Sequence, residues 1–236
     1  MKLIEFKNKN WILKIDLEGG RIYELSKDEE KILGTYERID GKMGNTHVCI
    51  PNFAREGVDS LGMVAHGPFR NQRWKLETGD KKVEKRIKAE VEGLEVEQVF
   101  SLEEGFSQKI IIKNNSSVAK RVNVAVHNYW DTPLSWHGLK LNGKDITEAV
   151  KENPEIKIKK ENILEIPGKK TIKWQLLGFN FVKVWTALKE EGKIKIYDPG
   201  YVCLEPLRQK EGFVESEASL LPPEGEIVVE QRIDCV

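Results

Sequence analysis

The chain has 236 residues, of which 39% are hydrophobic and 8% aromatic, and its 38 basic side chains balance 38 acidic ones. A net charge of zero removes the electrostatic attraction to nucleic-acid phosphates and anionic lipids, which argues against nucleic-acid and membrane partners. No apolar run approaches the roughly 20 residues that span a bilayer, and the first ten residues lack the apolar core of a signal peptide. We therefore expect a cytoplasmic protein.

The cysteines and the charged residues add two expectations. Cys49, Cys203 and Cys235 are an odd number at wide spacing, which suits neither a disulfide framework nor a CxxC metal site and favours a reducing compartment. All but nine of the acidic residues are glutamate and all but nine of the basic ones are lysine. This enrichment is typical of hyperthermophile proteins.

Alternating hydrophobic residues predict short, half-buried strands along most of the chain. In chain order, the predicted strands cover residues 11–17, 94–100, 106–112, 121–126, 156–166, 172–176, 181–187, 193–197 and 226–234. Residues 145–150 predict one short helical turn, and the pattern over 81–92 favours neither helix nor strand. We therefore expect an all-β fold, a large antiparallel β-sandwich. No linker or repeat divides the chain, so residues 1–236 are expected to form a single domain.

Residues 40–75 break the rhythm of strands. They are rich in glycine, contain two of the four histidines, and carry Phe53, Phe69 and Trp74, which argue against disorder. Long ordered loops in compact domains are often functional. This segment is therefore predicted to be a functional loop.

Three segments concentrate polar and aromatic residues: HGPFRNQRW at 66–74, HNYWDTP at 127–133 and YVCLEPLR at 201–208. His66 and Arg70 could be donors lining a polar pocket, or ordinary members of a hydrogen-bonded surface loop. Strand alternation places His127 on the face opposite Val122, Val124 and Val126. There it could act as an acid or base near neutral pH, or serve as a solvated or capping histidine.

Glu205 follows a largely uncharged stretch and is expected at the end of a buried strand. Burying a carboxylate is costly unless it is paired, so Glu205 is either a functional base or the ion-pair partner of a residue such as Arg208. Cys203 lies two residues earlier on the same face. A nucleophilic role would need a neighbouring base, and a small buried thiol is the favoured interpretation.

The sequence gives little support for a metal, and the tryptophans have two interpretations. No HExxH, HxH or CxxC spacing is present, so no metal site is predicted. The six tryptophans could stack on sugar rings, yet large aromatic residues dominate sandwich cores, and most are expected there.

Taken in order, several segments resemble the aldose 1-epimerase (mutarotase) family, and more closely its shorter hexose-6-phosphate-epimerase-like and uncharacterised branches. They are GGRIYEL at 19–25, IPNF at 50–53, HGPFRNQRW, HNYW and CLEP, followed by a turn and a final strand. The resemblance spans nearly the whole chain. It implies a β-sandwich of the galactose-mutarotase type, or supersandwich, in agreement with the strand pattern.

The resemblance also implies an activity, which is interconversion of the α and β anomers of a sugar without a cofactor. Glu205 matches the family's base, which removes the anomeric proton, and His127 matches the acid, which protonates the ring oxygen. His66 and Arg70 match positions that bind sugar oxygens and polarise the ring oxygen. The resemblance adds three expected sugar-binding residues: Asn52, Trp130 and Asn180. The expected ligand is a monosaccharide or a sugar phosphate.

Two departures from the family pattern leave alternatives open. The family usually carries an Asp that binds a sugar hydroxyl, and Asn180 lies beside that position. Pro68 stands where the family often has another small residue or an aromatic one. A non-catalytic carbohydrate-binding protein on the same scaffold is therefore the second hypothesis. A glycoside hydrolase is the third, because it needs a second carboxylate at roughly 5–9.5 Å, for which only Asp131 and Asp198 are candidates. For a phosphate group, four candidate cations are Arg21, Arg55, Arg73 and Lys140.

Overall fold

The computed structural model describes residues 3–51, 53, 64–77, 82–210 and 220–236. Within these ranges nearly all regular structure is β, with one helix, α2 (Thr147–Glu152), and one 3-10 turn, η1 (Phe69–Asn71). The all-β prediction and the helical turn predicted at 145–150 are confirmed. Over the same ranges, no helix has the length and apolar character to cross a membrane.

The first large sheet has eleven strands in the described part of the chain, and all its pairings are antiparallel. Its main path runs β1-β2-β3-β4-β13-β22-β12-β6; in addition, β5 pairs with β4, β19 with β22, and β16 with β19. The strands are β1 (Leu3–Asn8), β2 (Trp11–Asp16), β3 (Arg21–Lys27), β4 (Glu30–Glu37), β5 (Met43–Asn45), β6 (His47–Cys49), β12 (Ala125–His127), β13 (Tyr129–Asp131), β16 (Glu155–Lys157), β19 (Phe181–Trp185) and β22 (Tyr201–Leu207).

The second large sheet follows the order β15-β14-β17-β18-β24-β10-β9-β8-β7. Its strands are β7 (Lys75–Leu76), β8 (Glu84–Val91), β9 (Leu94–Ser101), β10 (Phe106–Asn114), β14 (Lys140–Leu141), β15 (Lys144–Asp145), β17 (Glu161–Glu165), β18 (Ile172–Leu177) and β24 (Glu226–Cys235). Two small pairs complete the description: β11 (Lys120–Arg121) with β23 (Leu220–Leu221), and β20 (Leu188–Glu191) with β21 (Ile194–Tyr197).

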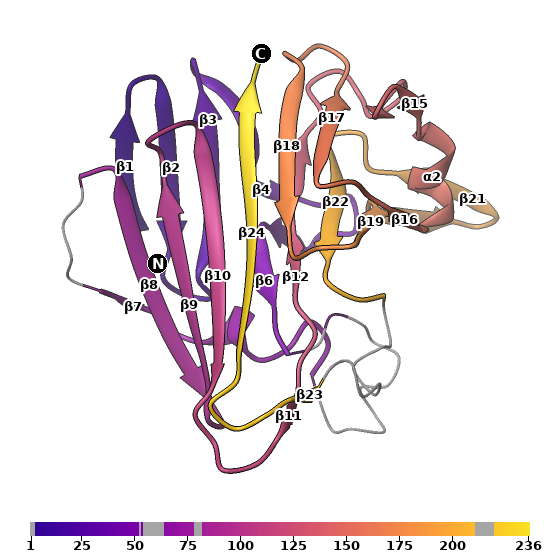
Figure 1. The fold of residues 1–236 in the computed structure, drawn as a ribbon. Coiled ribbons are helices and arrows are strands. Elements are labelled where there is room, and N and C mark those ends of the chain that lie inside the picture. The colour runs from indigo at the N-terminus through magenta and orange to yellow at the C-terminus, as the bar shows by residue number, and fades with distance from the viewer. Residues whose placement is uncertain (1–2, 52, 54–63, 78–81, 211–219) are drawn as a thin grey trace.

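The two large sheets form two layers, and their facing side chains make the core (Figure 1). Trp130 of the first sheet meets Trp174 of the second edge-on, with ring centroids 5.1 Å apart. Aromatic pairs in this arrangement contribute beyond the apolar area that they bury. The first sheet therefore has an inner face in the core and an outer face that is available for a site.

A chain of buried amides crosses the core between the sheets. Gln108 donates to Gln98 at 2.6 Å, Gln231 donates to Gln108 at 2.7 Å, and Asn128 donates to Gln231 at 2.8 Å. Buried amides are costly without partners, and here each one has at least one. The last amide in this series is Asn128, the residue after His127. Its side chain is hydrogen-bonded to Gln231 of the second sheet, and this contact fixes the position next to His127.

The structure also differs from several predictions. Residues 84–91, within the range that favoured neither helix nor strand, form β8. Within residues 40–75, β5, β6, η1 and β7 replace part of the predicted loop. The predicted strand at 121–126 is shorter, because regular pairing stops over residues 122–124 between β11 and β12. The period-2 pattern also missed β3, which carries most of the GGRIYEL motif, and β4.

Candidate active site

A row of ionisable side chains crosses the outer face of the first sheet. His127 of β12 pairs with His47 of β6, and Lys183 of β19 pairs with Glu205 of β22. The register between β22 and the chain through β12 and β13 places His127 opposite Glu205, because Ala125 pairs with Leu207 and Tyr129 with Cys203. Cross-strand neighbours lie about 4.5–5.5 Å apart at Cβ. Strand pairing therefore brings together four groups that are far apart in the sequence.

His127 lies at a break in its strand. The Asn128 amide donates to the Val126 carbonyl at 3.0 Å, a tight turn that separates β12 from β13. Val126 belongs to the core, whereas the His127 ring lies on the outer face, stacked on Tyr129 with centroids 4.9 Å apart and an interplanar angle of 12°. The predicted orientation of His127, away from the valines, is confirmed.

Glu205 and His127 form a buried pair. Glu205 Oε1 lies 3.3 Å from His127 Nε2, and the two side chains are 2% and 8% exposed. The structure thus places His127, and not Arg208, in contact with the Glu205 carboxylate, and the two form an ion pair only when His127 is protonated. Burial lowers the pKa of His127 well below its ordinary value, and the neighbouring His47 and His66 act in the same direction.

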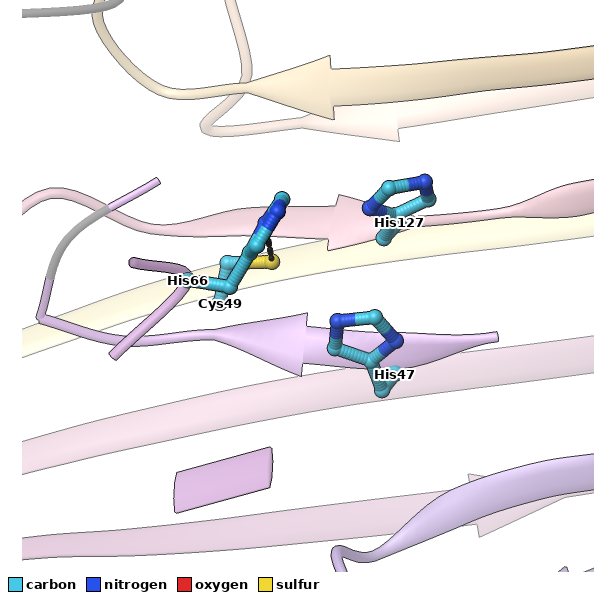
Figure 2. Close-up of side chains that lie close together, drawn as sticks. All are labelled: His47, Cys49, His66 and His127. Atoms are coloured by element: carbon cyan, nitrogen blue, oxygen red, sulfur yellow. Dashed lines mark hydrogen bonds between the residues drawn. The ribbon is translucent and has the colours of Figure 1, made fainter. Parts of the chain in front are cut away.

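The other side of His127 holds a cluster of two more histidines and a cysteine (Figure 2). The His47 ring stacks on His127 at 5.1 Å, and His66 lies 5.2 Å from His127 between ring centroids. Cys49 Sγ and His66 Nδ1 are hydrogen-bonded at 3.3 Å. Burial lowers the pKa of His47 to about 3 and raises the pKa of the Cys49 thiol well above its usual value. Both groups are therefore neutral near pH 7.

Local backbone geometry delivers His66 and Arg70 to this face. Gly67 has φ +69°, and a Cβ there would lie 1.8 Å from the Ile50 carbonyl oxygen, so only glycine fits the turn that carries His66. Arg70 lies in η1, and its carbonyl accepts a hydrogen bond from Arg21 Nη2 at 2.9 Å. Arg21 therefore supports the backbone of Arg70.

These side chains line a pocket of about 710 Å³, within the range of about 300–1,000 Å³ that is usual for small-molecule sites. Its lining residues are Arg38, Asp40, Lys42, Met43, Phe53, Ala65, His66, Arg70, His127, Asn153, Lys183, Trp185 and Glu205. Four cations face two carboxylates, so the lining has an excess of positive charge. Such a pocket favours a polar ligand that carries negative charge.

The turn after β4 forms one wall of the pocket. Arg38 lies over the Trp185 ring, with its guanidinium carbon 4.8 Å from the ring centroid, and pairs with Asp40 at 2.6 Å. A cation over an indole face gains electrostatic attraction from the ring. Trp185 is therefore the tryptophan at the pocket, and Arg38, paired with Asp40, covers one face of its ring.

The structure brings His66, Arg70, His127 and Glu205 together, as predicted, and it corrects two other predictions. Trp130 does not line the pocket: it is fully buried in the core, and its indole nitrogen donates to the Leu204 carbonyl, because strand alternation turns it to the inner face. Asn180 is exposed and does not line the pocket, since its side chain donates to the Arg208 carbonyl at 2.7 Å. Asn52 lies outside the described residues.

The expected phosphate-binding cations are also elsewhere. Arg21 supports Arg70 from outside the pocket, Arg73 is 72% exposed beside Glu18, and Lys140 is in the second sheet. Arg55 lies outside the described residues. Instead, the cations of the pocket are Arg38, Lys42, Arg70 and Lys183.

Sequence reasoning missed His47, Arg38 and Lys183, and it did not single out Trp185 among the six tryptophans. One local signal could have identified His47, because His47-Val48-Cys49 places a histidine and a cysteine on the same face of a strand. Cys203 agrees with its favoured interpretation: it is fully buried, and burial raises the pKa of its thiol well above the usual value. It is therefore a neutral buried thiol.

No protein-family model matches this sequence, and no curated protein matches it. Solved structures do match. The galactose mutarotase related enzyme from Lactobacillus acidophilus superimposes with a TM-score of 0.77 at 13% identity, over 100% of this chain and 97% of that one. The galactose mutarotase-like protein from Lactobacillus casei gives 0.76 at 11% identity, over 100% of both chains.

This chain has the galactose mutarotase-like fold. The aldose epimerase homologue from C. elegans shares it with a TM-score of 0.65 at 10% identity, over 100% of this chain and 99% of that one. The predicted sandwich of the galactose-mutarotase type is therefore confirmed as a fold. Because a fold can host several functions, the function has to be argued from the pocket.

Proposed function

We propose that this protein is an aldose 1-epimerase that interconverts the α and β anomers of an aldose or a hexose 6-phosphate. The observation that carries the proposal is the buried pair of Glu205 and His127, 3.3 Å apart, in a pocket large enough for a monosaccharide. The names of the solved structures with the same fold support the substrate class.

The proposed reaction needs one proton on the pair at the start. Glu205 as carboxylate takes the proton of the anomeric hydroxyl while His127 as imidazolium gives its proton to the ring oxygen. The bond between the anomeric carbon and the ring oxygen breaks, and the open-chain aldehyde forms. Rotation about the next carbon–carbon bond turns the carbonyl, and reclosure returns both protons while forming the other anomer.

The surroundings of His127 suit it to donate a proton. Burial and the neighbouring imidazoles lower its pKa, so the imidazolium is a stronger acid toward a weakly basic ring oxygen. The Glu205 carboxylate, 3.3 Å from Nε2, supplies the opposite charge that stabilises the imidazolium when it forms. A buried pair of this kind can hold one proton in either of two places, as the reaction requires.

His66 and Arg70 are proposed to bind the sugar. Both line the pocket beside His127. A guanidinium can donate hydrogen bonds to the ring oxygen and neighbouring hydroxyls, and it stabilises the negative charge that develops when the ring opens. In this proposal Arg21 is a positioning residue, because it holds the backbone carbonyl of Arg70.

The excess of cations favours a phosphorylated sugar. Arg38, Lys42 and Lys183 line the pocket in addition to Arg70, whereas a neutral sugar would need hydrogen-bonding groups but no net charge. Charge-assisted hydrogen bonds to phosphate are stronger than neutral ones. We therefore expect a hexose 6-phosphate to be a better substrate than the free hexose.

The glycoside hydrolase hypothesis loses its candidate partners. Asp131 pairs with Lys169 at 3.0 Å and accepts from Tyr36, and Asp198 accepts from the Ile39 and Gly200 amides. Neither aspartate lines the pocket. A non-catalytic sugar-binding protein on the same scaffold stays as the alternative outcome of the test below.

The direct test is exchange NMR of the anomeric protons across free and 6-phosphorylated aldoses, with the wild type and Glu205→Gln. Gln keeps the volume of the side chain but cannot accept the proton, so we expect exchange to fall by about 10²–10⁴-fold. Wild-type protein that binds a sugar without accelerating exchange would be a carbohydrate-binding protein. Full activity in Glu205→Gln would refute the assignment of the base.

A further inference from the structure

The cluster of His47, Cys49, His66 and His127 has a composition that the proposed epimerisation does not require. Only His66 and His127 line the pocket, whereas His47 and Cys49 lie behind them on β6. One ligand atom from each of the four residues lies within 4.8 Å of every other. We infer that this cluster is a binding site for a thiophilic divalent metal ion, Zn²⁺ above all.

The distances are close to those of a tetrahedral site. Zinc bonds of about 2.0–2.3 Å place neighbouring ligand atoms about 3.3–3.8 Å apart. Cys49 Sγ and His66 Nδ1 are already 3.3 Å apart, and the other separations, up to 4.8 Å, need a contraction of about 1 Å. The four side chains point toward a common space (Figure 2). Because the His47 and His127 rings are stacked, closing the site requires side-chain rotations that turn their nitrogens toward that space.

Hydrogen bonding prepares His47 as a ligand. Its Nδ1 lies 2.7 Å from the Asn45 carbonyl oxygen, which can only accept, so the proton is on Nδ1 and the lone pair is on Nε2. That Nε2 atom is buried, and it has no hydrogen-bond partner among the residues described. A ligating histidine that donates its second nitrogen to a backbone carbonyl is the usual arrangement at zinc sites.

His127 has a matching arrangement. Its Nε2 lies 3.3 Å from the Glu205 carboxylate, and its Nδ1 faces away from that carboxylate; both nitrogens are buried, and neither has a hydrogen-bond partner in the described part of the chain. A carboxylate beside one nitrogen favours a proton there and leaves the lone pair on the other. Two of the three imidazoles thus offer an unused, buried nitrogen.

The ligand types also suit a metal of this class. Histidine binds a metal as the neutral imidazole, and cysteine binds it as the thiolate. Binding therefore replaces the thiol proton with a bond from sulfur to the metal and releases one proton. Imidazole and thiolate donors select Zn²⁺ or Co²⁺ over Mg²⁺ and Ca²⁺, which prefer oxygen. A metal ion would reach the cluster from the pocket, because His66 and His127 line it.

A second group, His127, Cys203 and Glu205, also brings potential ligand atoms within 4.8 Å. It offers three residues instead of four, and Cys203 packs in a cluster with Tyr129, Tyr201 and Ala187. The two groups share His127 but differ in their cysteine. Substitution of each cysteine therefore distinguishes them.

The inferred site has a consequence for catalysis, which rests on the proposed function. A bound ion would coordinate His66, which is proposed to bind the sugar, and His127, which is proposed to protonate the ring oxygen. Zn²⁺ should therefore inhibit anomer exchange, and a chelator should restore it. The metal would be an inhibitor and no participant in the reaction.

The test uses Co²⁺ added to chelator-treated, reduced protein, followed by absorption spectroscopy and displacement with Zn²⁺. Wild type and Cys203→Ser should both show a sulfur-to-cobalt charge-transfer band and the strong visible bands of tetrahedral cobalt. Cys49→Ala should lose the charge-transfer band, and His47→Gln should weaken binding by at least about tenfold. Thermal unfolding of each variant verifies that it is folded.

Two results would overturn the inference: no cobalt spectrum in the wild type, or loss of the charge-transfer band in Cys203→Ser but not in Cys49→Ala. The spectrum does not depend on sugar turnover, so its failure would leave the epimerase proposal intact. A protein that binds Co²⁺ through Cys49 but exchanges no sugar would support the metal site and refute the epimerase.

Discussion

Two neighbouring rows of side chains cross the first sheet on the same four strands, β6, β12, β22 and β19. They lie on opposite faces of the sheet and differ in chemistry. The inner row is Val48, Val126, Pro206 and Val182. The outer row, one residue away along each strand, is His47, His127, Glu205 and Lys183. Because successive side chains point to opposite faces, a single residue separates the core from the candidate site.

This comparison shows how the fold supports buried ionisable groups. The inner row packs into the core between two sheets, so the backbone that carries the outer row is held on its other side. The outer row then places a carboxylate against an imidazole without exposing either, since both are under a tenth exposed. Rigid packing on one face allows precise placement of costly groups on the other.

The largest effect on the inner face is expected for Trp130→Ala. Removing this indole leaves a cavity against Trp174, so the free energy of unfolding should fall by about 3–5 kcal/mol, as measured by chemical denaturation. The milder Trp130→Phe should fold, and its apparent KM for sugar should equal that of the wild type. A raised KM in Trp130→Phe would instead place this tryptophan at the sugar.

A smaller effect is expected where the amide chain crosses the core. Gln231→Leu removes a partner from Gln108, Asn128 and Trp174, and an unpaired buried polar group costs about 1–3 kcal/mol. The neighbouring Arg232 is 53% exposed, so Arg232→Gln is a matched control that should change stability by less than about 0.5 kcal/mol. Equal stability of the two variants would contradict a stabilising role for the amide chain.

The smallest effect is expected at the end of the outer row. Lys183→Met keeps the length of the side chain but removes its charge, so the preference for a 6-phosphorylated over a free aldose should fall by about tenfold, or roughly 1.4 kcal/mol. The comparison is the ratio of kcat/KM for the two sugars. Asn180→Ala, outside the pocket, should leave that ratio unchanged. An unchanged ratio in Lys183→Met would remove this lysine from phosphate recognition.

Strands with one buried face and one exposed face could be predicted from the sequence, whereas strands without that pattern were harder to predict. Strands such as β2, β10 and β18 alternate regularly between buried and partly exposed residues, and each was predicted from that alternation. In β3 the register shifts near its middle, which interrupts the alternation, so local periodicity did not reveal this strand. β22 is buried on both faces and shows no alternation; its uncharged residues indicated a buried strand that ends at Glu205, and the strand continues to Leu207.

The candidate site shows a similar limit. His66, Arg70, His127 and Glu205 lie in short distinctive segments, so their residue types and their resemblance to a family could single them out. His47 and Lys183 join them only through pairing of β6 with β12 and of β19 with β22. Trp130 was expected at the sugar from the family resemblance alone, whereas strand alternation from His127 places it on the inner face with Val126.

The most direct test of the division between faces uses adjacent residues of β22, with thermal or chemical unfolding and anomeric exchange NMR measured on both variants. Leu204→Ala, on the inner face, should lower the free energy of unfolding by about 2–5 kcal/mol and retain exchange per folded molecule. Glu205→Gln, on the outer face, should abolish exchange and leave the protein folded. Loss of exchange in folded Leu204→Ala together with full exchange in Glu205→Gln would contradict the account.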